Sequence, residues 1–222
     1  MRGETYRDSS GRTLADYPRP SVAVDAAVLT LAPEAGLVVL QVRRDRGRGW
    51  ALPGTFLHPG ETLADAVDRA LRTKAGISGV HPRQLRVFDD PERDDRGWVL
   101  SVAHVAVVPA ERLARRFPDR TRLMPVQAPG RLVYDHAEII ALAVAEVRGR
   151  YRADPDPDHL LGDEFTLRQL RSVHEAIAGH PLQRDTFRRA MEPKLIPTGV
   201  TVTTGRGRPA ELFRRRGQDT AT

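Results

Sequence analysis

The fold of the first half of the chain is decided by residues 52–77, which read LPGTFLHPGETLADAVDRALRTKAGI. Glycine and proline are dense at the start of this stretch and predict a loop. Apolar residues then recur every three or four positions, as on one face of an amphipathic helix, at Leu63, Ala66, Val67, Ala70 and Leu71. Thr62 and Asp65 predict a capping box at the start of this helix, and Gly76 predicts its end.

The segments on both sides of this loop and helix have strand character. Four runs are rich in β-branched and other apolar residues: Ser21–Leu31, Leu37–Arg43, Gln84–Phe88 and Trp98–Val108. A second helix is predicted over Ala137–Tyr151. Because strands and helices are mixed along this part of the chain, we expect an α/β domain with a mixed sheet over residues 20–152.

The pattern changes after a segment rich in proline and aspartate, Ala153–Asp158, which predicts a linker over residues 153–162. The order that follows is a helix, a tight break, a short helix and two short strands around a basic turn. The predicted ranges are 165–178, 179–182, 183–191, 200–203, 205–209 and 210–213. This is the order of a winged helix-turn-helix, which we expect over residues 163–216.

Positive charge is concentrated in this predicted second domain. The 222 residues have a net charge of +6, and residues 163–216 contain eleven Arg and Lys against six Asp and Glu. A local surplus of this kind indicates a polyanionic partner. Lys74 and Lys194 are the only lysines, so arginine is common throughout the chain. Charge alone therefore leaves a nucleic acid partner and a solvated basic face both open.

Several classes of protein are excluded by composition. There are no cysteines, which excludes a disulfide scaffold and thiolate zinc sites. No apolar run approaches the ~18 residues that a membrane span needs, so we expect no membrane partner. Residues 1–19 are polar, without the apolar core of a secretory signal, and with residues 217–222 they are expected to be flexible tails. The predicted location is the cytoplasm.

The opening stretch resembles the Nudix box, G-x5-E-x7-R-E-U-x-E-E-x-G-U, where U is a bulky aliphatic residue. The match holds at Glu61, Arg69, Leu71, Gly76 and Ile77. It fails where Thr55 stands for the first glycine, and where Ala70, Thr73 and Lys74 stand for the three helix glutamates. The resemblance implies a Nudix-type α/β/α sandwich with a mixed sheet.

The four failures bear on catalysis. In Nudix hydrolases the helix glutamates hold a divalent metal that activates water. Ala70 offers no oxygen, and Lys74 places a positive charge where the metal would bind. We therefore predict no catalytic residues, no metal site and no required cofactor. Arg69 and Glu61 could remain as a structural ion pair.

What remains is a pocket shaped for a nucleotide. Arg43 and Arg44 could meet phosphates, because guanidinium groups pair with them bidentately. Trp50, Phe88 or Trp98 could stack on a base, although each could equally be a core residue. His136 could contact a ligand or cap the following helix. The candidate ligand-binding residues are Arg43, Arg44, Trp50, Thr55, Phe56, Arg69, Phe88, Arg96 and His136.

The whole chain from about residue 20 to residue 216 resembles the Nudix-related transcriptional regulator (NrtR) family. In the first domain the similar segments are DPERDDRGWVLSVAH (90–104) and DHAEII (135–140). In the second domain they include FTLRQL (165–170), PL (181–182), FRR (187–189), GRPA (207–210) and LF (212–213). One departure is Gln183, where family sequences often have an aspartate that caps the next helix better.

This resemblance implies a homodimer whose winged domains bind a palindromic operator in double-stranded DNA. It also implies an effector of the ADP-ribose type. Many members repress NAD-synthesis genes and others regulate sugar use, so the resemblance leaves the target genes open. The candidate DNA-binding residues are Thr166, Arg168, Gln183, Arg184, Thr186, Arg188 and Arg189, with Arg206 and Arg208 in the wing. Arginine reads guanine and glutamine reads adenine in the major groove, and a small cationic hairpin can reach a phosphate or the minor groove.

The function predicted from the sequence is therefore DNA-binding transcription regulation, by a repressor that senses ADP-ribose or a related nucleotide. Two alternatives stay open. One is a Nudix hydrolase of nucleoside diphosphate-linked substrates with an accessory nucleic-acid-binding domain. The other is an adaptor that binds RNA or protein.

Overall fold

The computed structural model describes residues 6–44, 48–203 and 209–216. The first domain is built on a seven-stranded mixed sheet whose main path runs β3-β2-β1-β6-β5, with β4 added to β1 and β7 added to β2. Its strands are β1 Ser21–Ala32, β2 Gly36–Arg43, β3 Trp50–Ala51, β4 Gly54–Phe56, β5 Arg83–Phe88, β6 Val99–Val107 and β7 Thr121–Pro125. The central strands β1 and β6 are parallel, and β1 and β2 are antiparallel.

Helices cover both faces of this sheet, so the domain is the predicted α/β/α sandwich. One face packs on α2 (His136–Ala153), and the other on α1 (Leu63–Ala70) and the π-helical turn η2 (Leu71–Ala75). Alternate residues of β1 serve the two cores, because successive strand side chains point to opposite faces. Ala27 and Leu29 face α2, whereas Ala26 and Val28 face α1. Two short 3₁₀ segments, η1 (Leu14–Asp16) and η3 (Ala110–Leu113), complete this part of the chain.

The start and the end of the first helix are as predicted. The Thr62 hydroxyl accepts a hydrogen bond from the Asp65 amide, and the Asp65 carboxylate accepts one from the Thr62 amide. Gly76 ends the segment with a φ of +73°, a conformation that glycine adopts without strain. The structure differs from the prediction in the last five residues of this helix, Leu71–Ala75, which form a π-helical turn instead of continuing the α-helix.

The second domain has the predicted winged-helix order. It contains β8 (Phe165–Thr166), α3 (Leu167–Ala178), α4 (Arg184–Met191), the 3₁₀ turn η4 (Glu192–Lys194), β9 (Leu195–Val202) and β10 (Ala210–Arg215). The sheet order is β8-β10-β9, and the core consists of Phe165, Leu170, Phe187, Met191, Leu195 and Phe213. β9 begins five residues before the predicted Val200, because the buried side chain of Leu195 anchors it in this core.

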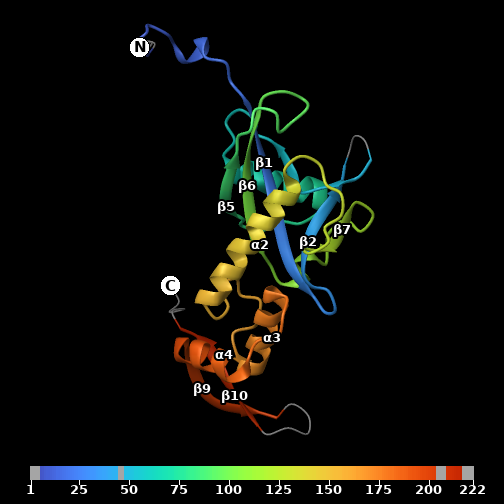
Figure 1. Cartoon of the computed structure of the whole chain (residues 1–222), viewed down its shortest axis with the longest axis vertical. Helices are drawn as coiled ribbons and strands as arrows, with labels where there is room; N and C mark the ends of the chain where they lie inside the picture. The colour runs from blue at the N-terminus through green and yellow to red at the C-terminus, as the bar shows by residue number, and fades with distance from the viewer. Residues whose placement is uncertain (1–5, 45–47, 204–208, 217–222) are drawn as a thin grey trace.

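The two domains meet at the end of α2, which extends from the sheet toward the winged domain (Figure 1). Val173 and Ile177 of α3 belong to the same buried cluster as α2 and the sheet. The segment expected as a linker is packed in this junction. Its Asp156 is buried and accepts hydrogen bonds from the Tyr151 hydroxyl, the amides of residues 160 and 161, and the Arg215 guanidinium. The junction is therefore an ordered, hydrogen-bonded unit.

None of the helices in the described ranges combines the length and the apolar content needed to cross a membrane.

Candidate effector pocket and DNA-binding surface

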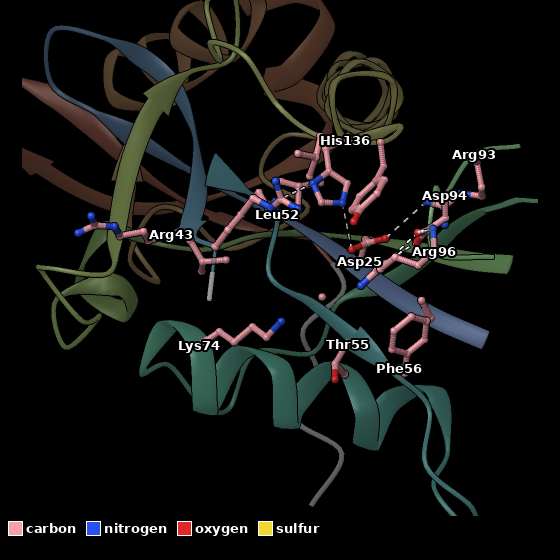
Figure 2. A pocket seen from close by; sticks show the side chains of 17 residues that line it. Asp25, Arg43, Leu52, Thr55, Phe56, Lys74, Arg93, Asp94, Arg96 and His136 are labelled. Carbon is pink, nitrogen blue, oxygen red and sulfur yellow. Dashed lines mark hydrogen bonds and ion pairs between the residues drawn. The ribbon is translucent and has the colours of Figure 1, made fainter. Parts of the chain in front are cut away.

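A cavity of about 430 Å³ lies between the start of α2, the edge of the sheet and the π-helical turn (Figure 2). The strands contribute side chains from one side, and the loops before β6 and before α2 contribute others. The start of α2 contributes His136, and the π-helical turn contributes Lys74. The polar and aromatic residues that line it are Asp25, Arg43, Arg44, Thr55, Phe56, Lys74, Arg93, Asp94, Arg96, Tyr134 and His136. The cavity brings together β1, β2, β4, η2 and α2, segments that are far apart in the sequence.

Asp25 is the centre of a buried hydrogen-bond network in this cavity. Its carboxylate accepts a hydrogen bond of 2.6 Å from the Ser101 hydroxyl and lies 3.3 Å from Nε2 of His136. Arg93 Nη2 lies 3.9 Å from the same carboxylate, and Arg93 Nε donates to Asp135 at 2.6 Å. Burial favours a higher pKa for Asp25, but His136, Ser101 and Arg93 together lower the pKa below its usual range. The group is therefore a fixed carboxylate.

His136 links this network to the strand side of the cavity. Its Nδ1 accepts a hydrogen bond of 3.0 Å from the Leu52 amide, which places the proton of the neutral ring on Nε2, facing Asp25. His136 is also the first residue of α2. Of the two alternatives left open by the sequence, the structure supports the side chain that lines the cavity. The N-cap position of α2 is occupied by Asp135, and the His136 ring contacts Leu52 and Asp25 instead of capping the helix. Gly54 lets the backbone approach closely, because a Cβ there would lie 2.0 Å from an Asp25 oxygen.

Aromatic rings and an arginine form one end of the cavity. The Arg96 guanidinium lies 5.0 Å from the ring centroids of both Phe56 and Tyr134. Asp94 holds Arg96 in this position through hydrogen bonds of 2.8 and 2.6 Å. Aromatic rings and a planar guanidinium are surfaces on which a base or a sugar can stack.

Three cations in the cavity have no charged partner within residues 6–44, 48–203 and 209–216. Arg43, Arg44 and Lys74 make no side-chain hydrogen bond or ion pair with any residue that the structure describes. The other two arginines of the cavity, Arg93 and Arg96, are both paired with carboxylates. The positive charge available to a ligand therefore comes from the end of β2 and from the π-helical turn.

Six of the nine ligand-binding residues predicted from the sequence line this cavity: Arg43, Arg44, Thr55, Phe56, Arg96 and His136. The other three lie elsewhere. Phe88 is part of the buried core, and the Trp50 ring is covered by the Arg122 guanidinium at 4.4 Å. Neither ring lines the cavity, so neither is placed to stack on a ligand bound there.

Arg69, the third, holds the loop before α1 in place. It makes two hydrogen bonds to the Glu61 carboxylate, at 2.7 and 2.8 Å, and others to the Thr55 hydroxyl and the Phe56 carbonyl. The hydrogen bonds from Arg69 lower the pKa of Glu61 to about 2. The structural ion pair that the sequence left open is therefore present, and it orients two residues of the cavity.

Sequence reasoning missed Asp25, Arg93, Asp94 and Tyr134 as site residues. A signal for Asp25 was available, because a single carboxylate stands in an otherwise apolar strand, SVAVDAAVLTL, and buried carboxylates need a partner. The partner could not be found from the sequence, because His136 lies 111 residues later. Arg93 and Asp94 lie within a segment that carried the family resemblance, and Tyr134 directly precedes another. Nothing in their spacing along the chain indicated that they would contact the same cavity.

The predicted DNA-binding residues divide between two sides of α4. Thr166, Arg168, Arg184 and Arg188 line a hollow between α3, α4 and β10, together with Arg171, which the sequence analysis did not select. Gln183 and Thr186 line a separate groove beside the end of α2. Arg189 is exposed and lines neither. Arg206 and Arg208 lie outside the described residues.

The two arginines of α4 in the hollow differ in their partners. Arg188 makes a bidentate ion pair with Glu192 on the same helix, at 2.6 and 2.9 Å. Arg184, at the first turn, has no side-chain partner among residues within the described ranges. Gln183 caps this helix, since its side-chain oxygen accepts from the Thr186 amide at 2.6 Å. Of the two, Arg184 is the guanidinium that is free to bind DNA without first breaking an ion pair.

The fold and the two surfaces define a class of protein with a Nudix-type nucleotide pocket joined to a winged helix-turn-helix. Comparison with known families agrees on both halves. Residues 21–143 match the NUDIX domain, and residues 157–215 match the NrtR DNA-binding winged helix domain. The chain belongs to the NrtR family.

Similar proteins extend over nearly the whole chain. A crystal structure of Shewanella oneidensis NrtR complexed with a 27mer DNA is 30% identical, covers 88% of this chain and 93% of its own, and has a TM-score of 0.71. The ADPR responsive transcriptional repressor NtrR of Acinetobacter baylyi is 29% identical over 92% of this chain and 85% of its own. An ADP-ribose pyrophosphatase of Methanocaldococcus jannaschii is 29% identical over 56% of this chain and 73% of its own.

Proposed function

We propose that this protein is a transcriptional repressor whose Nudix domain binds ADP-ribose or a related nucleotide and whose winged helix-turn-helix binds DNA. The observation that carries this proposal is the presence of two cationic surfaces, the effector cavity and the α3–α4 hollow, on domains that share one buried core. The A. baylyi relative, named as an ADPR responsive repressor, supports the same combination.

The cavity suits each part of an ADP-ribose molecule. The diphosphate can bind Arg43, Arg44 and Lys74, whose charges are not neutralised by a described residue. The Phe56–Arg96–Tyr134 stack can hold the adenine or a sugar face. A volume of about 430 Å³ is within the range of small-molecule sites.

Binding to DNA would place α4 in the major groove, as in other helix-turn-helix proteins. Arg184 and Arg188 would then lie near base edges, and Thr166 and Arg168 at the start of α3 would lie near the phosphate backbone. We propose that the chain acts as a homodimer on a palindromic operator, because two-fold symmetric proteins of this type bind two half-sites. Such a protein works in the cytoplasm.

The helix α2 connects the effector cavity to the DNA-binding domain. It begins at His136 in the cavity, and Tyr151 lies about 22 Å further along, at a rise of about 1.5 Å per residue. The Tyr151 ring packs edge-on against His174 of α3 at 5.2 Å, and His174 packs against Phe187 of α4 at 4.9 Å. A ligand that shifts the start of α2 would thus act on the helix that binds DNA through three rings in contact.

The second candidate function is a diphosphate hydrolase, which the M. jannaschii relative keeps open. We expect ADP-ribose to stay intact during prolonged incubation with the protein and Mg²⁺ or Mn²⁺, because Ala70, Thr73 and Lys74 supply no carboxylate. Chromatography of the nucleotide is the measurement. Release of AMP at an ordinary enzyme rate of ~1 s⁻¹ or more would identify the protein as an enzyme.

A further inference from the structure

The residues at the Nudix metal position do not fit a divalent cation. Ala70 is fully buried under the sheet and has no oxygen in its side chain. The Thr73 hydroxyl donates to the Arg69 carbonyl at 2.7 Å. Lys74 brings an ammonium group to the wall of the cavity. A divalent metal at such a site needs several oxygen ligands, and these three side chains offer none that is free and anionic.

Nearby carboxylates do not replace the missing ones. Glu61 is bound on both oxygens by Arg69. Asp65 caps α1, and Asp68 pairs with Arg72 at 2.5 Å on the exposed side of the helix. Within the described ranges, no group of three or more His, Asp or Glu side chains is placed to hold a metal ion.

Lys74 instead supplies a positive charge on the same wall of the cavity. The side chain extends from its helix toward the cavity, on the side opposite His136 (Figure 2). It is partly buried, and no residue in the described part of the chain neutralises it. The glycine that ends the π-helical turn, Gly76, fixes the backbone two residues later. The ammonium is thus available to an anion inside the cavity.

We propose that the Lys74 ammonium takes the place of the divalent metal and binds the diphosphate of the effector directly, so that effector binding is independent of metal. Arg43 and Arg44, at the end of β2, also line the cavity and add positive charge to it. This proposal rests on the proposed function and specifies how its ligand is held. A bound ammonium neutralises phosphate charge but does not activate water as a divalent metal does, so the ligand is held without being cleaved.

Isothermal titration calorimetry of the full chain tests this proposal. Wild-type protein is expected to bind ADP-ribose with the same Kd, within about twofold, in EDTA and in excess Mg²⁺. Lys74→Met should weaken binding about tenfold or more in both buffers, as expected for the loss of a charge-assisted hydrogen bond. Arg72→Met is the matched control, because Arg72 is a cation on the same turn that pairs with Asp68 and does not line the cavity. It should leave the Kd unchanged.

A second variant, Lys74→Glu, reverses the charge and restores a carboxylate. In EDTA it should bind ADP-ribose far more weakly than Lys74→Met, because a carboxylate repels the diphosphate that the ammonium attracts. The proposal is overturned if wild-type binding requires Mg²⁺, or if Lys74→Met binds as tightly as the wild type. Inorganic pyrophosphate serves as a second probe. If the protein binds pyrophosphate through Lys74 but does not bind ADP-ribose, then ADP-ribose is not the effector. The proposal that Lys74 binds a diphosphate would still hold.

Discussion

Replacing Asp156 with alanine is expected to lower the free energy of unfolding by about 3–5 kcal/mol, the range measured when one partner of a buried ion pair is removed. Asp156 is 2% exposed, and its two oxygens accept four hydrogen bonds at the domain junction. Its loss would leave the buried Arg215 guanidinium without a counter-charge and two backbone amides without an acceptor. Urea unfolding followed by circular dichroism measures the change.

Two variants serve as controls for this result. Arg214 pairs with Glu164 on the surface next to the junction, and Arg214→Ala should change the free energy of unfolding by about 1 kcal/mol or less, because exposed ion pairs contribute little. Asp156→Asn keeps the shape of the side chain and loses its charge. Its free energy of unfolding should therefore lie between those of Asp156→Ala and the wild type. A loss below about 1 kcal/mol for Asp156→Ala would show that the junction is not held by this carboxylate.

The second large effect is expected at Arg184. Arg184→Ala should cost about 1–3 kcal/mol of DNA-binding free energy per half-site, and the cost should count twice in a dimer. The reason is its position at the first turn of α4, in the basic hollow and without a partner among the described residues. The wild type is expected to select two-fold symmetric sites from random DNA. The variant should select sites with relaxed preference at one position of each half-site.

Arg188→Ala provides the comparison. Arg188 is already bound to Glu192, so it would have to give up this ion pair to contact DNA. The loss of the ion pair would offset part of the binding free energy that the DNA contact provides. We therefore expect Arg188→Ala to weaken DNA binding less than Arg184→Ala does. Equal selection profiles for Arg184→Ala and the wild type would mean that Arg184 does not read a base. If Arg184→Ala instead binds all DNA sequences equally more weakly, and its affinity depends less on salt concentration, then Arg184 contacts a phosphate.

The sequence predicted well those features that local patterns determine. The capping box of α1 and the turn at Gly76 follow from residues only three or four apart, and the structure confirms them. The β-branched and apolar run at residues 21–31 predicted a strand, and the structure has the largely buried strand β1 there. The Glu61–Arg69 pair followed from the spacing of the Nudix box, which places both groups in one loop-helix unit.

Features that depend on contacts between distant residues could not be predicted. The composition of residues 153–158 indicates a linker, and nothing local shows that Arg215, 59 residues later, covers Asp156. The same holds for the Asp25–His136 contact. Aromatic residues were selected for stacking by type alone, and type does not distinguish the buried Phe88 from Phe56, which faces the cavity. Tertiary packing decided between them.

Reciprocal coupling between effector and DNA is the central claim of this account, and one pair of titrations tests it most directly. The affinity for the selected operator is measured without and with saturating ADP-ribose, and the affinity for ADP-ribose without and with operator. Both should change by the same factor, about 5–150-fold for a typical coupling free energy. An unchanged operator affinity, with ADP-ribose binding demonstrated by calorimetry in the same buffer, would contradict the claim that the Nudix domain controls DNA binding.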